Sequence, residues 1–120
     1  GLSELGLSIM ADRFDIVRQK LLQFRDQRDW ARYHDPKNLA EAISIESGEL
    51  LENFLWKTAA ESRRLNYSEI QAIGQEAADI FIYITYLCEE LDIDLMEEAT
   101  KKLKLNENRF PIKAERSAED

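Results

Sequence analysis

Residues 38–56 read NLAEAISIESGELLENFLW, and the apolar residues in this stretch recur every three or four positions. This period is typical of an amphipathic helix, which we expect over residues 38–60. At about 100 degrees per residue, Glu46 falls near the centre of the apolar face. The apolar side chains that share this face are Leu39, Ile43, Leu50 and Phe54. A carboxylate placed there is costly to bury unless a positive charge compensates it.

The other glutamates of this helix are not equivalent to Glu46. Glu49 lies at the edge of the same face, whereas Glu41 and Glu52 fall on the opposite side, where solvated charges belong. Glu46 and Glu49 therefore form an ExxE pair on adjacent turns, close enough to share one ligand.

A second acidic pair occurs beside the apolar run AADIFIYITYLC at residues 77–88. Asp79 is the only formal charge in that run, and Glu76 precedes it by three residues. We expect a helix over residues 68–91. The side chains predicted to form its core stripe are Ile73, Ala77, Ile80, Ile84 and Leu91. Both acidic pairs thus lie on helix faces that the pattern predicts to be semi-buried.

The rest of the chain also has a helical pattern, with only four Gly and two Pro. We expect one further helix over residues 12–28 and another that opens at Asp94 and ends before Pro111. For the two central helices, the predicted N-caps are Asn38 and Ser68. Short connections between long amphipathic helices predict an all-α fold, a four-helix antiparallel bundle.

Composition limits the classes of partner. The 120 residues fit one domain, 1–120, in which residues 1–10 and 113–120 are expected to be flexible tails. A net charge of -8 disfavours a nucleic-acid polymer or a membrane surface as partner. The single cysteine, Cys88, predicts a reducing, cytoplasmic location. Apolar surface left over by a bundle of this size predicts a homo-oligomer.

Four semi-buried carboxylates would repel one another, and a divalent cation would remove that cost. Carboxylate oxygens without His or Cys suit Mg²⁺, or Mn²⁺. A single ExxE or ExxD pair more often marks a solvated helix face, so it is the occurrence of two inward pairs that favours a metal site. A di-iron site is disfavoured because it usually needs Glu-x-x-His elements, and the only histidine, His34, lies in a linker. We expect His34 to order that linker through hydrogen bonds.

The ExxE pair, a gap of 26 residues and the ExxD pair resemble the signature of the MazG-like all-α nucleoside triphosphate pyrophosphohydrolases. Three longer blocks resemble the dCTP-pyrophosphatase-like branch of that family. They are RDWARYHDPKNLAEAISIESGELLENFLW at residues 28–56, EAADIFIYI at 76–84 and KLKLNENRFP at 102–111.

This resemblance implies hydrolysis of a nucleoside triphosphate to a monophosphate and pyrophosphate, with dCTP or a modified deoxynucleotide as substrate and nucleotide-pool cleaning as the role. The Mg²⁺ ligands that it implies are Glu46, Glu49, Glu76 and Asp79. Glu49 is also our candidate for the group that orients or deprotonates the attacking water. Members of the family are homodimers or homotetramers, and we expect a tetramer.

The resemblance also implies substrate contacts. It assigns Lys102, a second catalytic candidate, and Asn106 to phosphate and sugar contacts, and Arg109 is a further candidate for phosphate. The aromatic positions that it implies around the base are Trp30, Trp56 and Tyr83. Core packing remains the alternative for Trp56 and Tyr83, and a solvated helix end remains the alternative for Lys102 and Asn106.

One residue departs from the pattern of the cytosine-preferring relatives, because Leu21 occupies the position where they carry a histidine. This leaves the base selectivity open. An enzyme of the same fold that acts on dUTP or phosphoribosyl-ATP is one alternative. A non-catalytic helical oligomerisation module is the other.

Overall fold

The computed structural model describes the backbone of residues 4–113 and the side chains of residues 13–113; within this part of the chain every regular element is helical. The elements are α1 Glu4–Gln27, the 3-10 helix η1 Ala31–Tyr33, α2 Pro36–Glu52, α3 Ala59–Ser62, α4 Tyr67–Glu90 and α5 Leu95–Arg109. The predicted all-α class is confirmed. The predicted long helices correspond to α1, α2, α4 and α5, and α3 is an additional single turn.

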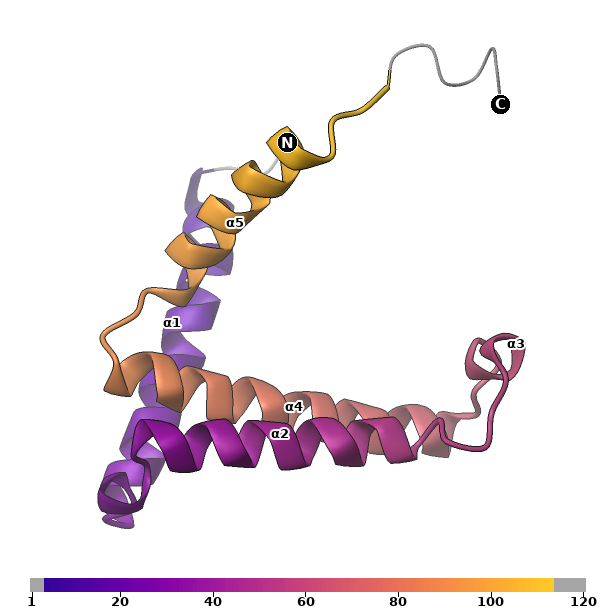
Figure 1. The fold of residues 1–120 in the computed structure, drawn as a ribbon. Helices are drawn as coiled ribbons and strands as arrows, with labels where there is room; N and C mark the ends of the chain where they lie inside the picture. The colour runs from indigo at the N-terminus through magenta and orange to yellow at the C-terminus, as the bar shows by residue number, and fades with distance from the viewer. Residues whose placement is uncertain (1–3, 114–120) are drawn as a thin grey trace.

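Helices α2 and α4 lie side by side and antiparallel, and they form the principal packed unit of the chain (Figure 1). Helix α1 crosses α4 near the C-terminal end of α4, and α5 leaves from that same end (Figure 1). Helix α3 lies at the opposite end of the α2–α4 hairpin (Figure 1). The carboxylate motifs are therefore on the hairpin, whereas α1 and α5 extend away from it.

The inward face of α2 is the one that its sequence predicts. Leu39 is 1% exposed, and Glu46 is half-buried in the middle of that face. The other half-buried members of the face are Ile43, Leu50 and Phe54. On α4 the predicted stripe is only partly correct, because Ala77 and Leu91 are exposed. Ala77 lies near the middle of α4, and Leu91 is the residue directly after its last turn.

The helix boundaries differ from the prediction at several points. Asp35, not Asn38, caps α2, because its carboxylate accepts a hydrogen bond from the Asn38 amide at 2.8 Å and Pro36 follows it. Helix α2 ends at Glu52, not at residue 60. The side chain of Asn53 donates to the carbonyl of Glu49 at 3.2 Å and closes the last turn there. The apolar residues after Asn53 continue the helical period in sequence without continuing the helix.

Two further starts are corrected and one is confirmed. Helix α4 is capped by Asn66, which forms a capping box with Glu69, rather than by Ser68. Helix α1 begins at Glu4, eight residues before the predicted start at residue 12. Asp94 caps α5 as predicted, with its carboxylate accepting from the amide of Glu97 at 3.0 Å. The predicted C-terminal tail lies outside the described residues from residue 114 onward.

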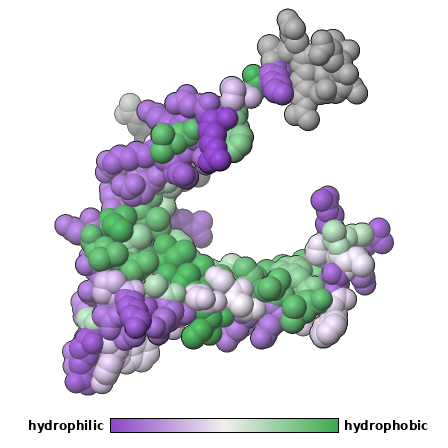
Figure 2. All heavy atoms as spheres, viewed as in Figure 1, coloured by the Kyte–Doolittle hydropathy of each residue, from purple (hydrophilic) through white to green (hydrophobic). Residues whose placement is uncertain are grey.

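Apolar side chains remain exposed over much of the molecule. Figure 2 shows them along the hairpin and on one side of α5. Ile45 is 62% exposed on α2, Leu105 is 61% exposed on α5, and Ile112 is 98% exposed beyond α5. Among the described residues, none of the helices has the length and apolar character that a membrane crossing requires.

Candidate functional site

Three of the predicted metal ligands converge between α2 and α4. Glu46 and Glu49 come from α2 and Glu76 comes from α4, and one carboxylate oxygen of each lies within 4.8 Å of the others. The antiparallel pairing of the two helices produces this approach, because each acidic residue lies on the face that its helix turns toward the other. We call these three residues the carboxylate cluster. Glu46 and Glu76 are half-buried, and Glu49 is exposed.

The electrostatics of the carboxylate cluster are unfavourable for three ionised groups. The Oε2 atoms of Glu46 and Glu76 are buried and have no hydrogen-bond partner. When one of the two carboxylates is protonated, the proton can form a hydrogen bond between Glu46 and Glu76. This hydrogen bond is the largest cause that raises the pKa of Glu46 to about 7. Burial and the nearby charges of Glu49 and Asp79 raise it further. Near neutral pH the cluster therefore needs either a proton or a cation.

The chemistry of the cluster fits a hard divalent cation. Carboxylate oxygens from adjacent turns and from a facing helix are the kind of ligand that Mg²⁺ and Mn²⁺ prefer, and the unpartnered oxygens of Glu46 and Glu76 are free to bind one. Exposed Glu49 keeps one side of the cluster open to solvent, which leaves room for water or a substrate.

Asp79, the fourth predicted ligand, is not in the three-residue cluster. It is exposed, one turn after Glu76, and its charge helps to raise the pKa of Glu46. Asp79 also lines a cavity of about 480 Å³ between α1, α4 and the linker that joins α1 to α2. It therefore lies where the carboxylate cluster meets this cavity.

This cavity, which we call the aromatic pocket, is lined mainly by apolar side chains. Its wall includes the side chains of Leu21, Phe24, Trp30, His34, Tyr83 and Tyr86. Trp30 is held edge-on to Phe24, with ring centroids 5.5 Å apart. Two of the three predicted base-binding aromatics, Trp30 and Tyr83, thus lie in one pocket next to Asp79.

His34 and Tyr86 form a part of the aromatic pocket that the sequence prediction missed. The two rings lie 4.9 Å apart with an interplanar angle of 32°. The prediction that His34 orders the linker through hydrogen bonds is wrong for its Nδ1, which is buried without a partner. Burial is the main cause that lowers the pKa of His34, and it also raises the pKa of Tyr86, so both rings are neutral near pH 7.

A sequence signal for this pocket did exist. Val17, Leu21 and Phe24 form an apolar stripe on the first helix, and the structure places all three at the pocket wall. Val17 and Phe24 remain 37% and 42% exposed, so the stripe lines a cavity and not a closed core.

The remaining predicted substrate contacts are not brought to this site within one chain. Trp56 is 94% exposed and lies between α2 and α3. Helix α3 is at the end of the hairpin away from α1 (Figure 1). Lys102, Asn106 and Arg109 are exposed on α5, which makes no extensive contact with α2 or α4.

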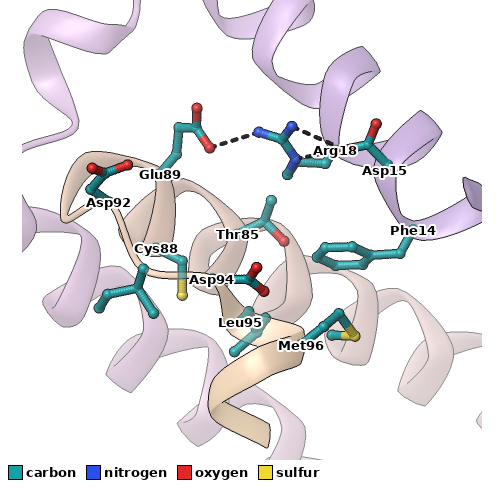
Figure 3. A pocket seen from close by; sticks show the side chains of 11 residues that line it. Phe14, Asp15, Arg18, Thr85, Cys88, Glu89, Asp92, Asp94, Leu95 and Met96 are labelled. Carbon is teal, nitrogen blue, oxygen red and sulfur yellow. Dashed lines mark hydrogen bonds and ion pairs between the residues drawn. The ribbon is translucent and has the colours of Figure 1, made fainter. Parts of the chain in front are cut away.

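A second cavity, of about 470 Å³, lies on the other side of the crossing between α1 and α4 (Figure 3). Phe14, Met96 and Leu95 form apolar parts of its wall, and Arg18 lies between Asp15 and Glu89, with an ion pair of 2.9 Å to each (Figure 3). Because Arg18 is already neutralised by these two carboxylates, it is not a free anion-binding group. None of the predicted substrate contacts lines this cavity.

The fold and the carboxylate cluster define a class of all-helical proteins with an acidic site between two antiparallel helices. Residues 42–120 match the MazG-like family. This match covers more than half of the chain, and the chain belongs to the MazG-like family.

Individual proteins similar to this chain agree with that membership. The human dCTP pyrophosphatase 1 is 35% identical over 104 residues, which are 85% of this chain and 61% of the human protein. The rat dCTP pyrophosphatase 1 is 33% identical over the same coverage. This chain thus spans less than two thirds of the length of these relatives. A crystal structure of a pyrophosphatase from Archaeoglobus fulgidus has a TM-score of 0.74 and 38% identity, and the match covers 86% of this chain and 93% of the archaeal one.

Proposed function

We propose that this protein is a nucleoside triphosphate pyrophosphohydrolase, in which water adds across the anhydride between the α and β phosphates and releases a monophosphate and pyrophosphate. The observation that carries the proposal is the junction of the carboxylate cluster with the aromatic pocket at Asp79. A base-binding cavity beside a cluster of metal-binding carboxylates suits a nucleotide. The similarity to the human and rat dCTP pyrophosphatases and to the archaeal pyrophosphatase supports the same reaction class.

We expect the carboxylate cluster to hold Mg²⁺, with Mn²⁺ as the alternative and Asp79 as a further ligand. When bound, such an ion neutralises phosphate charge and lowers the pKa of an attacking water. The unpartnered Oε2 atoms of Glu46 and Glu76 support this assignment, because a cation would satisfy both of them.

The open position of Glu49 suits it to act on the attacking water. Its carboxylate is the exposed member of the cluster and can accept a proton from water and pass it to solvent. Glu46 and Glu76 are less suited, because they face each other in the half-buried part of the site.

Trp30 and Tyr83 supply the aromatic faces on which a base would stack. Stacking on such side chains is worth about 1 to 3 kcal/mol per base and discriminates little between bases. We propose dCTP or a modified deoxynucleotide as the substrate, and removal of such nucleotides from the cellular pool as the role. Leu21 offers no hydrogen bond to the base, so a polar group elsewhere in the pocket must provide any selectivity.

A second copy of the chain would complete this site. The chain exposes 10011 Å², whereas a compact monomer of this mass exposes about 6,700 Å². Obligate interfaces bury about 2,000 to 5,000 Å² in total, which is about 1,000 to 2,500 Å² per partner, so the excess on one chain is more than one such interface would cover. We propose a homo-oligomer, a tetramer in preference to a dimer, in which α5 of one copy brings Lys102, Asn106 and Arg109 to the carboxylate cluster of another.

The charge distribution supports this arrangement. In its C-terminal part, residues 101–109, α5 carries Lys101, Lys102, Lys104 and Arg109 against Glu107, together with the exposed apolar side chains of Leu103 and Leu105, whereas its first turn carries Glu97 and Glu98. The whole chain has a net charge of -8. This basic C-terminal part of α5, against which no other described helix packs extensively, is complementary in charge to the acidic hairpin of another copy.

Two alternatives to this function can be distinguished from it by measuring the products of nucleotide hydrolysis. A same-fold enzyme for dUTP or phosphoribosyl-ATP would use the same carboxylates with a different base or sugar. A non-catalytic helical module would release no pyrophosphate from any nucleotide. The cytoplasmic location stays a prediction.

The proposal is tested by a panel of nucleoside triphosphates with and without Mg²⁺, in which the product is identified. We expect pyrophosphate from dCTP or a modified deoxynucleotide only when Mg²⁺ is present. Glu49→Gln should lose this activity, whereas Glu52→Gln, on the outer side of the same helix, should retain it.

The alternatives give different products in the same panel. Preference for dUTP or phosphoribosyl-ATP would replace the proposed substrate and keep the reaction. Orthophosphate as the initial product would overturn the proposed bond, and the absence of turnover with every nucleotide would overturn the enzymatic function.

A further inference from the structure

The crossing of α1 and α4 determines the shape of the aromatic pocket. One wall comes from α4 with Tyr83, and the other comes from α1 and the linker with Leu21 and Trp30. Extensive packing in this chain is between α2 and α4, and α1 meets α4 over a short region only. The width of the pocket therefore depends on the few contacts of this crossing.

Tyr86 makes the central contact of the crossing. Its hydroxyl donates a hydrogen bond to the backbone carbonyl of Leu21 at 2.8 Å, and its side chain is 3% exposed. Its ring stacks with His34 of the linker, and the Arg25 guanidinium lies 5.9 Å from the ring centroid. One residue of α4 thus contacts both segments that form the opposite wall.

The ion pairs beside Tyr86 are weaker candidates for the same role. Arg18 and Glu89 approach to 2.9 Å (Figure 3), but their side chains are 28% and 36% exposed, and solvent screens such pairs. Arg25 and Glu90 are 3.8 Å apart, beyond hydrogen-bond distance. The buried hydrogen bond and ring contact of Tyr86 therefore determine the crossing more than the ion pairs do.

Tyr86 lies one turn after Tyr83, and His34 lies four residues after Trp30. A shift of the Tyr86 ring relative to Leu21 and His34 would change the separation between Trp30 and Tyr83. These are the two aromatic side chains between which the proposed function places the base.

We propose that Tyr86 is a positioning residue that sets the spacing of the aromatic pocket and thereby the affinity for the nucleotide base. This inference rests on the proposed function for the identity of the ligand. Tyr86 does not touch the carboxylate cluster, so its effect falls on nucleotide binding and not on the metal-dependent step.

The test compares Tyr86→Phe with Tyr67→Phe, a matched control at the 77% exposed first residue of the same helix. Tyr86→Phe keeps the ring and loses the hydrogen bond to Leu21. We expect KM for the preferred nucleotide to rise about threefold to tenfold, with kcat within about twofold of wild type. Tyr67→Phe should leave both constants unchanged. A purely structural role would lower the thermal stability and leave KM at the wild-type value.

A second measurement requires no turnover. The chain has two tryptophans, so in a Trp56→Phe background the fluorescence reports Trp30 alone. Adding Tyr86→Phe to this background should increase the quenching of Trp30 by acrylamide, because the linker is held less firmly. If the wild-type protein releases no pyrophosphate, the proposed function fails, and the quenching measurement still decides the positioning role. Unchanged KM in an active protein, or unchanged quenching of Trp30, would overturn the inference.

Discussion

Glu46 on α2 and Glu76 on α4 meet inside the hairpin, whereas Lys102 on α5 is exposed and α5 has no extensive packing partner in its own chain. Both regions carry residues that resemble the family pattern. The hairpin brings its residues together because α2 and α4 each present a semi-buried face to the other. Helix α5 exposes apolar and basic residues, and no other described helix packs extensively against it. One half of the proposed site is therefore intramolecular, and we propose that the other half comes from another copy.

The largest expected effect comes from breaking the intramolecular half. Glu46→Gln removes a carboxylate from the half-buried centre of the cluster, and pyrophosphate release should fall by about 1,000-fold, on the order of 4 kcal/mol. The measurement is pyrophosphate production at saturating Mg²⁺. Glu52→Gln, which removes an exposed glutamate from the same helix, should stay within about twofold of wild type. Full activity of Glu46→Gln would remove the cluster from the mechanism.

A smaller effect is expected from breaking the α5 half. Lys102→Ala removes one proposed phosphate contact, and kcat/KM should fall by about 100-fold. Lys104→Ala is the control, because Lys104 lies on the same exposed helix and carries the same charge.

The intermolecular character of that half has its own test. When Glu46→Gln and Lys102→Ala proteins are unfolded together and refolded as mixed oligomers, some sites combine an intact cluster with an intact α5. Activity should then return to a measurable fraction of wild type. If the mixed oligomers stay inactive, the account is contradicted. Either Lys102 and Glu46 act in a site formed by a single chain, or one of them does not belong to the site.

A modest effect on stability is expected from the cluster in metal-free protein. The folded-state pKa of Glu46 is about 7, above its ordinary value of 4.5. Its contribution to the free energy of unfolding is therefore fully present below about pH 4.5 and is lost as pH rises through about 7. Urea unfolding in EDTA should show that Glu46→Gln becomes more stable relative to wild type as pH increases. A difference that does not change with pH would contradict the crowded-carboxylate account.

The smallest effect on stability is expected at His34. Its contribution is lost as pH falls, whereas that of Glu46 is lost as pH rises. Burial, with a contribution from Arg25, lowers the pKa of His34 below its ordinary value of 6.5, although Glu90 opposes this. The stabilisation by the neutral ring is fully present above about pH 6.5, the ordinary pKa, and is lost as pH falls below it through the lower folded-state pKa. Wild type should therefore lose stability relative to His34→Gln between about pH 7 and pH 5, measured by urea unfolding. No change in the difference over that range would mean that His34 titrates normally.

Sequence patterns predicted the hairpin and its acidic face well, because both depend on local periodicity. The phase of Leu39, Ile43 and Leu50 placed Glu46 inward, and the structure confirms this. The cap at Asp94 was also predicted, because an aspartate followed three residues later by Glu97 is a local signal. At α2 the competing caps Asp35 and Asn38 are three residues apart, and the proline between them favours the earlier one.

The end of α2 and the packing of α1 on α4 depend on contacts between segments that are distant in sequence. The spacing of apolar residues along one helix does not predict such contacts. The apolar residues that follow Asn53 continue the period of α2, so the sequence predicted a helix where the structure has a turn. The hydrogen bond from Tyr86 to Leu21 joins positions 65 residues apart, and neither residue belongs to a sequence motif that predicts this contact. Lys102 and Trp56 lie away from the cluster in one chain, and in the proposed oligomer their positions relative to it would also depend on contacts that a sequence period does not encode.

The central claim is that carboxylates from α2 and α4 together hold one divalent cation, and Mn²⁺ binding followed by electron paramagnetic resonance tests it most directly. Wild type and Glu52→Gln should bind Mn²⁺ with the same affinity, Mg²⁺ should compete for the site, and Glu46→Gln and Glu76→Gln should each weaken binding by at least about tenfold. Equal Mn²⁺ binding by all four proteins would contradict the account, since the cation would then lie elsewhere.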